Sequence, residues 1–418
     1  MRMVKRISRF IILCMGILMA ASSVSATGTL TQIPVSQFTT IKIDGQSHGQ
    51  FRGNAAFLFD SLAPEITPKE LYYSPITKWT YALDNFNVFK GVDEDVLFAF
   101  DSSGKLAQKT IIQEQGYQQL IPGKDTLFVY VLPSIMLHAA KPNVLYAFDL
   151  KGKLKWKYTF TEPQQMFSPV WQTGPQDAFY TVTSDAIVCI RDGKLAWKMK
   201  VPSITNNLNL KQVTTVSLRV DSSGNVYILD QNGWIEKRDI KQQLVWREKL
   251  GSALFEVIGN DRYLVSSQHL KHTYFDANTG KRVKEPKIDY ASYNRFTLPN
   301  DRKGGFYAPE KEDSYGLPSG NGVVKFNEKG QIIWHYKLRF SGYSSIAPLS
   351  LMSDDQGNVY FLDNGGHLYS LDSNGNERFI VLTRDINRSY TPLYVSPEGV
   401  AVSANGDAGI YKVTIRKK

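Results

Sequence analysis

Histidine and cysteine are the side chains of this chain best suited to metal or nucleophilic chemistry, and neither is arranged for it. The histidines are scattered at His48, His138, His269, His272, His335 and His367. The spacing of His269 and His272 would place them on opposite faces of a strand. The sequence contains no HExxH motif, no Gly-x-Ser-x-Gly elbow and no phosphate-binding glycine loop. Cys189, between Val188 and Ile190, is interpreted as a small buried hydrophobe. The sequence therefore predicts no catalytic residue and no metal site.

Acidic residues recur in the pattern Asp-x-x-Gly, which suits either a calcium loop or a turn. Asp101 and Asp149 are each followed three residues later by glycine, at Gly104 and Gly152. Calcium takes about six to eight oxygen ligands, and no loop of this sequence collects that many. In a turn, the Asp side chain accepts bonds from backbone N–H groups, and the glycine takes the left-handed conformation of a bulged hairpin loop. We therefore interpret these motifs as hairpin turns.

The turns lie within a repeated hairpin. Residues 145–158 read LYAFDLKGKLKWKY, residues 187–200 read IVCIRDGKLAWKMK, and residues 323–337 read VVKFNEKGQIIWHYK. Each copy is an alternating apolar strand, a turn and a second strand. Weaker copies lie at 96–109, 235–249, 273–286 and 368–381. The turn positions include Gly104, Gly152, Gly193, Gly330 and Gly375, and Gln242 takes this place in the copy at 235–249. The period of about 45 residues is typical of one four-stranded propeller blade.

A second strand pattern supplies the other half of the repeat. GNVYILDQNG at 224–233 and GNVYFLDNGG at 357–366 each precede a hairpin. A further inner half at 399–413 has no outer strand after it. We expect the alternating segment 38–44 (FTTIKID) to complete that last blade and close the ring. The sequence thus predicts an all-β propeller of eight four-stranded blades. Seven is the alternative, because residues 55–73 fit no repeat.

The hairpin pattern of Tyr-Ala-Phe/Leu-Asp, Gly-Lys and Leu-x-Trp resembles the repeat of the pyrroloquinoline-quinone-type (PQQ-like) β-propeller superfamily. The resemblance covers residues 75–418. The resemblance implies the propeller fold. The superfamily includes quinoprotein dehydrogenases, the propeller lipoprotein of outer-membrane assembly and secreted propellers that catalyse no reaction. The enzymes need calcium ligands, a catalytic carboxylate and usually a vicinal disulfide. One cysteine remains after the leader, so that disulfide cannot form, and we expect no PQQ, no calcium and no other cofactor.

The repeated tryptophans are interpreted as structural. Trp156, Trp197, Trp246 and Trp334 lie on the predicted outer strands. The resemblance implies that such tryptophans pack between neighbouring blades while the glycines make the turns. An indole buries about 200 Å² of mainly apolar surface. We therefore expect these tryptophans to hold the blades together rather than to recognise a ligand.

The first 26 residues are typical of a secretory signal peptide. A basic start at Arg2, Lys5 and Arg6 precedes the apolar run 10–21, and cleavage is predicted after Ala26. The run is too short to span a membrane. Cys14 lies inside it and is a poor lipidation site. We expect a cleaved, secreted protein with an N-terminal segment at 27–74, the propeller at 75–418 and no membrane-spanning segment.

The distribution of basic residues indicates that the outer strands of the predicted propeller face solvent. The formal net charge is +10, and removal of the four basic leader residues leaves +6. Lysines alternate with apolar residues on the predicted outer strands, as at Lys155, Lys157, Lys198 and Lys200. This is the pattern of a solvated sheet face. A mild affinity for anionic wall polymers or lipid headgroups is the alternative, and no nucleic-acid partner is expected.

Two expanded loops between second and third strands are the predicted binding face. The loop 132–143 contains Met136 and His138, and the loop 309–321 contains Glu310, Asp313 and Tyr315. Variable loops on a rigid scaffold often carry binding, although an expanded loop is also tolerated without function.

These features favour a secreted, non-catalytic and monomeric propeller. Its expected role is to bind a protein or a cell-envelope glycan through its loops. A quinoprotein-type oxidoreductase and an envelope assembly factor resembling the outer-membrane lipoprotein are the alternatives.

Overall fold

The computed structural model describes most of the chain after residue 38. The described ranges are 39–43, 46–53, 57–63, 68–86, 94–114, 116–132, 142–161, 170–183, 186–200, 215–230, 232–250, 255–258, 261–268, 271–284, 299–303, 305–310, 322–327, 331–338, 350–363, 367–382, 393–405 and 409–415. None of the helices in these ranges has the length and apolarity needed to cross a membrane.

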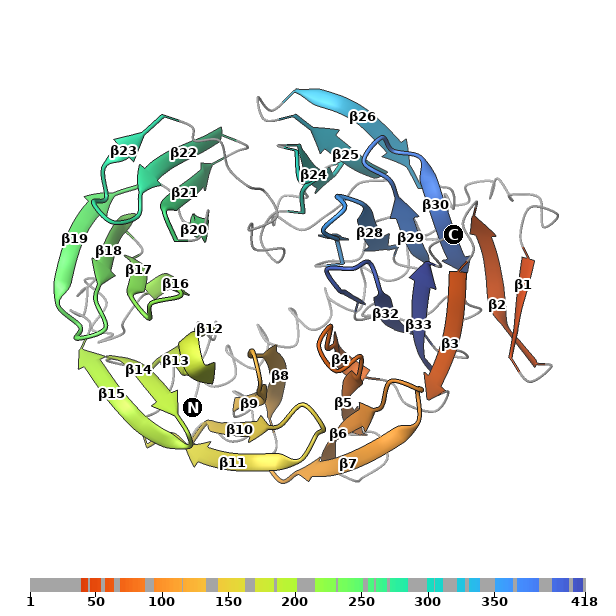
Figure 1. Ribbon diagram of the computed structural model, residues 1–418, viewed down its shortest axis with the longest axis horizontal. Helices are drawn as coiled ribbons and strands as arrows, with labels where there is room; N and C mark the ends of the chain where they lie inside the picture. The colour runs from red at the N-terminus through yellow and green to blue at the C-terminus, as the bar shows by residue number, and fades with distance from the viewer. Residues whose placement is uncertain are drawn as a thin grey trace, which may run out of the picture.

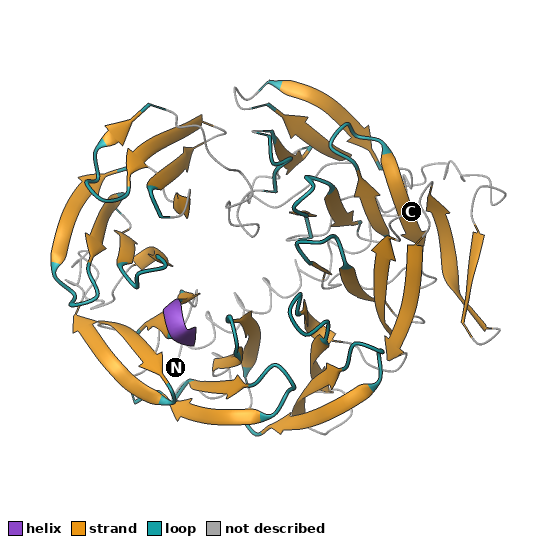
Figure 2. Cartoon of the chain, in the orientation of Figure 1, coloured by secondary structure: helices purple, strands orange, loops and turns teal. Residues whose placement is uncertain are grey.

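The described strands form eight antiparallel sheets set around a ring, and in most of them the strands run in chain order from the centre to the circumference (Figure 1). Almost all of the described regular structure is strand, apart from the short 3-10 helix η2 (Pro175–Asp177) (Figure 2). The chain is therefore all-β, as the sequence predicts.

The first four sheets follow chain order. They contain β4 (Pro68–Tyr73), β5 (Thr80–Phe86), β6 (Glu94–Phe100) and β7 (Leu106–Ile112); β8 (Tyr117–Pro122), β9 (Leu127–Leu132), β10 (Val144–Phe148) and β11 (Leu154–Thr159); β12 (Trp171–Thr173), β13 (Phe179–Val182), β14 (Ala186–Arg191) and β15 (Lys194–Lys200); and β16 (Thr215–Val220), β17 (Val226–Asp230), β18 (Trp234–Arg238) and β19 (Leu244–Lys249).

The next four sheets include the strands that precede β4 in the chain. They contain β20 (Phe255–Ile258), β21 (Tyr263–Gln268), β22 (Lys271–Asp276) and β23 (Arg282–Val283); β24 (Phe306–Pro309), β25 (Gly322–Phe326) and β26 (Ile332–Lys337); β27 (Met352–Ser353), β28 (Val359–Leu362), β29 (Leu368–Leu371) and β30 (Glu377–Leu382), with β1 (Thr39–Ile43) and β2 (Gln46–Gly53); and β31 (Leu393–Val395), β32 (Ala401–Asn405) and β33 (Gly409–Ile415), with β3 (Phe57–Ala63).

The hairpin turns have the geometry that their sequence favours. Asp101 Oδ1 accepts hydrogen bonds from the backbone N–H groups of Ser103 at 2.9 Å and Lys105 at 3.1 Å. Gly104 has a φ of +84°, in the left-handed region that glycine adopts without steric cost. Asp149 and Gly152 repeat this arrangement. Gln242 takes a φ of +68° at the equivalent position without being glycine. In each case the turn reverses the chain and starts an outer strand.

The core lies between sheets rather than inside any one of them. Seven clusters of buried apolar side chains each join two neighbouring sheets. One of them packs Leu71 of β4 and Phe98 of β6 against Val402 of β32 and Ile410 of β33. The first and the last sheets of the chain are therefore in contact, and sheet stacking around the ring supplies most of the burial.

The predicted ring-closing strand at residues 38–44 is wrong. β1 pairs with β2, and β2 pairs with the outer strand β30, so that both extend another sheet. The strand that completes the last sheet is β3, which pairs with β33 from Phe57 opposite Ile415 onward. Both N-terminal segments are short and extended, and their local pattern does not tell them apart. β3 directly precedes β4 in the chain, and β4 lies in the adjoining sheet, so β3 reaches the last sheet through the shorter connection.

Candidate functional site

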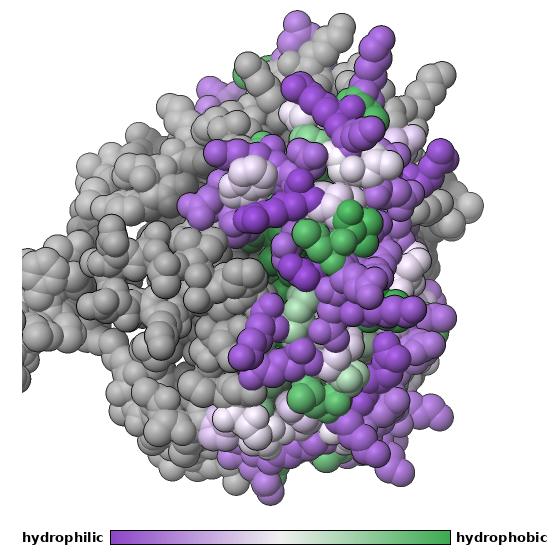
Figure 3. Space-filling model, turned by 90° about the vertical axis from the view of Figure 1, so that its left-hand side faces the viewer, coloured by the Kyte–Doolittle hydropathy of each residue, from purple (hydrophilic) through white to green (hydrophobic). Residues whose placement is uncertain are grey.

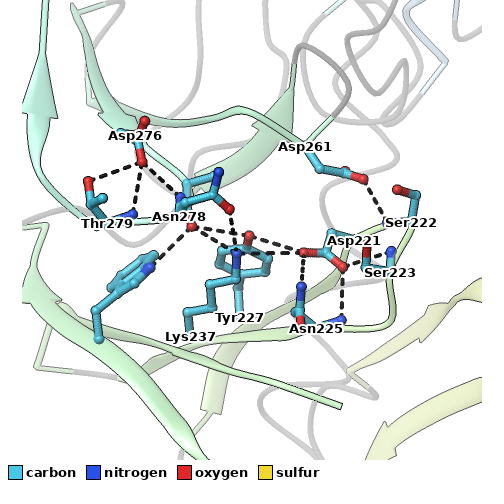
Figure 4. Close-up of polar contacts among 12 residues, drawn as sticks. Asp221, Ser222, Ser223, Asn225, Tyr227, Lys237, Asp261, Asp276, Asn278 and Thr279 are labelled. Carbon is cyan, nitrogen blue, oxygen red and sulfur yellow. Dashed lines mark hydrogen bonds and ion pairs between the residues drawn. The ribbon is translucent and has the colours of Figure 1, made fainter.

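Asp221 lies at the centre of a buried polar cluster between two neighbouring sheets (Figure 4). Its Oδ1 accepts bonds from the backbone N–H groups of Ser223 at 3.0 Å and Asn225 at 2.8 Å. Its Oδ2 accepts from Asn225 Nδ2 at 2.8 Å and from the Tyr227 hydroxyl at 3.2 Å. The turn from β16 to β17 thus holds the carboxylate, and β17 supplies the tyrosine that donates to it.

Side chains from three strands of this sheet converge on one backbone carbonyl of the next sheet. Ala277 O, just after β22, accepts from Lys237 Nζ at 3.0 Å and from Trp246 Nε1 at 3.1 Å. The Tyr227 hydroxyl lies 3.4 Å from the same oxygen. Lys237 Nζ also lies 3.9 Å from Asp221 Oδ2. We call Asp221, Tyr227, Lys237, Trp246 and Ala277 the Asp221 junction. It ties the sheet β16–β19 to the sheet β20–β23.

The charges of the Asp221 junction are shielded from solvent. The side chains of Lys237 and Asp221 are 5% and 3% exposed. Burial lowers the pKa of Lys237, although the nearby carboxylates of Asp221, Asp261 and Asp276 act in the opposite direction. Burial also raises the pKa of Tyr227, and the charge of Asp221 adds to this effect. Tyr227 therefore keeps its proton at neutral pH and remains a hydrogen-bond donor.

The same arrangement recurs between the sheet β24–β26 and the sheet β27–β30. Lys325 Nζ lies 2.6 Å from Asp301 Oδ2 and donates to Ser373 O at 2.7 Å. Trp334 Nε1 donates to the same carbonyl at 3.2 Å. Tyr307 takes the place of Tyr227 but donates to Gly357 O at 2.6 Å. We call Asp301, Tyr307, Lys325, Trp334 and Ser373 the Asp301 junction.

Parts of the arrangement recur at two more boundaries. The Tyr81 hydroxyl donates to Leu150 O at 2.6 Å, and Leu150 follows its turn aspartate just as Ser373 does. The Tyr360 hydroxyl donates to Asp354 Oδ2 at 2.9 Å and accepts from Arg378 Nη1 at 2.8 Å. Lysine, aspartate and tyrosine are also common in proton-transfer sites. Here, however, the lysines donate to carbonyls of the next sheet while the aspartates are bonded within their own sheet, and the recurrence around the ring indicates a structural role.

The repeat tryptophans pack against the turn glycines of the following sheet. A Cβ atom on Gly193 would lie 3.1 Å from Trp156, one on Gly280 2.8 Å from Trp246, and one on Gly375 3.0 Å from Trp334. Gly152 lies against Gln108 in the same way. Trp197 belongs to the cluster between the sheets β12–β15 and β16–β19. Each of these side chains therefore contributes to a contact between sheets.

The repeat tryptophans and the buried aspartates of the described residues are engaged in contacts within the ring. The repeat tryptophans are packed against other parts of the ring. Asp221 and Asp301 are bonded to backbone N–H groups and to side chains. In the part of the chain that the structure describes, no three His, Cys, Asp or Glu side chains are grouped to hold a metal ion.

Most of the predicted binding loops lie outside the described residues. Met136, His138, Asp313 and Tyr315 belong to the ranges 133–141 and 311–321. The turn residue Gly330 also lies outside. Glu310, at the end of β24, is described. Its N–H donates to Gly322 O at 2.9 Å, and its Oε1 lies 3.3 Å from His335 Nε2. Glu310 therefore contacts the neighbouring strands of its own sheet.

Sequence reasoning missed the buried Asp–Tyr pairs, although a signal for them exists. The segments DSSGNVY at 221–227, DRKGGFY at 301–307, DDQGNVY at 354–360 and DNGGHLY at 363–369 all place Tyr six residues after Asp. The glycine between the two residues is explained by a backbone turn, and this explanation does not require the Asp side chain to be buried or to contact the Tyr. The cation that completes each junction comes from the following strand of the same sheet, with Lys237 on β18 and Lys325 on β25, and it has no such fixed spacing.

The outer rim of the ring carries exposed aliphatic residues at equivalent positions. Each pairs on the turn side of the bulge in its hairpin, two residues before the position of the repeat tryptophan. Their exposed fractions are 45% for Leu106, 44% for Leu154, 46% for Leu195, 52% for Leu244 and 65% for Ile332. Figure 3 faces the side of the ring with β15, β19 and β23, and shows separate apolar patches on a mainly hydrophilic surface.

The same rim is strongly basic. The outer strands β3, β7, β11, β15, β19, β23, β26 and β30 carry three acidic residues, Asp60, Glu248 and Glu377. Against these stand the basic residues Lys109, Lys155, Lys157, Lys194, Lys198, Lys200, Arg247, Lys249, Arg282, Lys337 and Arg378. The rim therefore presents cations and exposed aliphatic side chains together.

Comparisons with known proteins agree with this architecture. The chain is similar to BamB from Moraxella catarrhalis at 14% identity, covering 91% of this chain and 100% of that one with a TM-score of 0.49. It is similar to the C-terminal WD40 domain of Sif2 at 8% identity, covering 86% and 99% with a TM-score of 0.53. The second likeness shows the propeller fold. No curated protein matches the chain significantly. The family model described as outer membrane protein assembly factor BamB matches residues 62–286, more than half of the chain, and the chain therefore belongs to this family of PQQ-like propellers.

Proposed function

We propose that this protein is a non-catalytic scaffold that binds a protein partner at the cell envelope or outside the cell. The basic rim with exposed aliphatic residues at equivalent positions carries the proposal. At the Asp221 and Asp301 junctions, the buried lysines donate hydrogen bonds to carbonyls of the next sheet, and Lys325 also pairs with Asp301. Within the described residues, the rim combines exposed cations with exposed aliphatic side chains. The family description, an assembly factor of the outer membrane, supports a protein partner over a glycan.

Location outside the cytoplasm belongs to the same proposal. The basic start, the apolar run 10–21 and the small residues Ser25 and Ala26 support export with cleavage after Ala26. The site of cleavage is checked by N-terminal sequencing of the protein recovered from its native cell. A mature chain that still begins at Met1 would contradict it.

Site-specific photo-cross-linking tests the scaffold role directly. A photoreactive amino acid replaces Leu195 on β15 or Ile332 on β26, both of which are exposed. In native cells these positions should form discrete adducts with a protein. The matched control places the same group at Ile76, which is 62% exposed in the turn between β4 and β5 and should give no such adduct. Equal labelling at all three positions, or none at any, would contradict the proposal.

The non-catalytic part of the proposal has its own experiment. Mature protein is incubated with pyrroloquinoline quinone and calcium, and its melting temperature and visible spectrum are recorded. We expect no rise in melting temperature and no bound chromophore, because the repeat tryptophans are packed between sheets. A coloured, stabilised complex would instead support the quinoprotein alternative.

A further inference from the structure

One outer edge of the ring is already extended by strand addition. β2 pairs antiparallel with the outer strand β30, with Gln50 opposite Leu382 and Gly53 opposite Phe379. β1 then pairs with β2, and the sheet grows to six strands. The added hairpin is separated from β30 by most of the chain length. The backbone of an outer strand in this fold is therefore able to accept a further strand.

β15 presents an edge of the same kind without an added strand. It runs over seven residues, Lys194–Lys200, and pairs with β14 along its inner side. In the described residues no strand pairs with its outer side. An unpaired edge of this length offers a row of backbone donors and acceptors. Basic residues on an edge strand discourage pairing with copies of itself, and they favour a partner of opposite charge.

The register of β15 places Lys198 and Lys200 on one face of the sheet, whereas the bulge before Trp197 leaves Lys194 on the same face as Trp197. Lys198 pairs with Val188 and Lys200 with Ala186, so both lysines lie on one face of the sheet. Trp197 pairs with Cys189 and lies on the other. β15 carries no acidic residue, and Lys194 and Lys200 are exposed. A complementary strand would place carboxylates beside Lys198 and Lys200 and apolar side chains beside Trp197.

We infer that β15 is the docking edge for an extended acidic segment of a protein partner. The segment adds to Lys194–Lys200 as a further strand, with acidic residues alternating with apolar ones. The addition repeats at β15 what β2 does at β30. This inference rests on the proposed scaffold function and names the chemistry of its partner.

The probe is a synthetic peptide of about eight residues with blocked ends, in which Glu alternates with Val. Fluorescence anisotropy should show binding to the mature protein. The variant K198E/K200E should bind at least about tenfold more weakly, because two attractive charges on the face that meets the carboxylates become repulsive. The control K249E/K337E reverses two exposed charges on β19 and β26 and should change binding less than about twofold. Equal losses in both variants would show non-specific attraction and overturn the inference.

Backbone pairing is tested separately from charge. Hydrogen–deuterium exchange should slow for amides within 194–200 when the peptide binds. A peptide N-methylated at every second residue keeps its carboxylates but cannot form the ladder, and should lose binding. Retained binding of that peptide, protection elsewhere, no peptide binding, or binding of phosphatidylglycerol vesicles in its place would each overturn the inference.

The two proposals fail in distinguishable ways. If Ile332 or Leu195 cross-links a protein in cells while the peptide leaves β15 unprotected, the scaffold function stands and the β15 assignment is wrong. If neither position cross-links a protein, the scaffold function itself is wrong.

Discussion

Lys325 Nζ lies 2.6 Å from Asp301 Oδ2, and the two side chains are 10% and 7% exposed. The same ammonium donates to Ser373 O in the next sheet at 2.7 Å. One lysine therefore neutralises a buried carboxylate of its own sheet and ties that sheet to its neighbour. Its counterpart Lys237 does the same at Ala277 O, with the ion pair longer at 3.9 Å.

Removal of Lys325 should destabilise the ring strongly. K325M leaves the buried Asp301 carboxylate unpaired, and we expect a loss of about 3 kcal/mol in the free energy of unfolding. Chemical denaturation followed by tryptophan fluorescence measures it. K337M, on the exposed end of β26, should cost less than about 0.5 kcal/mol. The double variant D301N/K325M should recover part of the loss. If the loss of unfolding free energy in D301N/K325M equals the sum of the losses in the two single variants, the pair is not coupled.

The free energy of unfolding should decrease at low pH, and protonation of Asp301 should account for part of the decrease. Burial opposes its ionisation, but the Lys325 hydrogen bond and the backbone N–H groups of Lys303 and Gly305 outweigh burial and lower the pKa of Asp301 from its ordinary 3.8. The stabilisation that ionised Asp301 gives to the folded protein is fully present above the pKa that Asp301 has in the unfolded chain. As pH falls through the lower pKa of the folded state, this stabilisation is lost, because the unfolded chain binds more protons.

The variant D301N should therefore lose less stability than the wild type between about pH 5 and about pH 2. Denaturant midpoints across that range measure this. The carboxyls of Asp276 and Asp372, whose pKa values are also lowered, provide a background that both proteins share. Parallel pH profiles of the two proteins would contradict the assignment.

Gly280 should tolerate a methyl group less well than Gly224. Both have positive φ, +71° and +84°, so alanine is strained at either position. A Cβ on Gly280 would lie 2.8 Å from the Trp246 ring, while at Gly224 the nearest atom is 3.7 Å away. We expect G280A to cost about 1–3 kcal/mol more than G224A through overpacking. Equal melting temperatures would show that Trp246 shifts freely.

The N-terminal strands should differ in their importance for solubility. A chain that begins at residue 55 keeps β3 on β33, whereas one that begins at residue 65 leaves the outer edge of β33 unpaired. We expect the first to remain monomeric and the second to aggregate, because an open edge recruits other strands. Size-exclusion chromatography distinguishes the outcomes. Aggregation of both chains would instead assign the protective role to β1 and β2.

The sequence by itself determined the local units of this protein. Asp101, Gly104 and their equivalents predict hairpins because turn chemistry is written in residues a few positions apart. The regular spacing of the hairpins predicts an all-β propeller, because a sheet that cannot bury its faces alone must stack on neighbours. The Asp–Tyr spacing of Asp221 and Tyr227 is local too, and its burial was missed because the cation comes from another strand.

Tertiary structure alone decided the contacts between distant segments. Which N-terminal strand joins β33 depended on reach and on competition with the β1–β2 hairpin, and local alternation in 39–43 and 57–63 does not encode either. Lys237 and Lys325 look like other strand lysines in the sequence. Strand pairing within a sheet places their ammonium groups beside a buried carboxylate. Only the packing of that sheet on the next brings them to a carbonyl, which lies 40 residues away along the chain for Lys237 and 48 for Lys325.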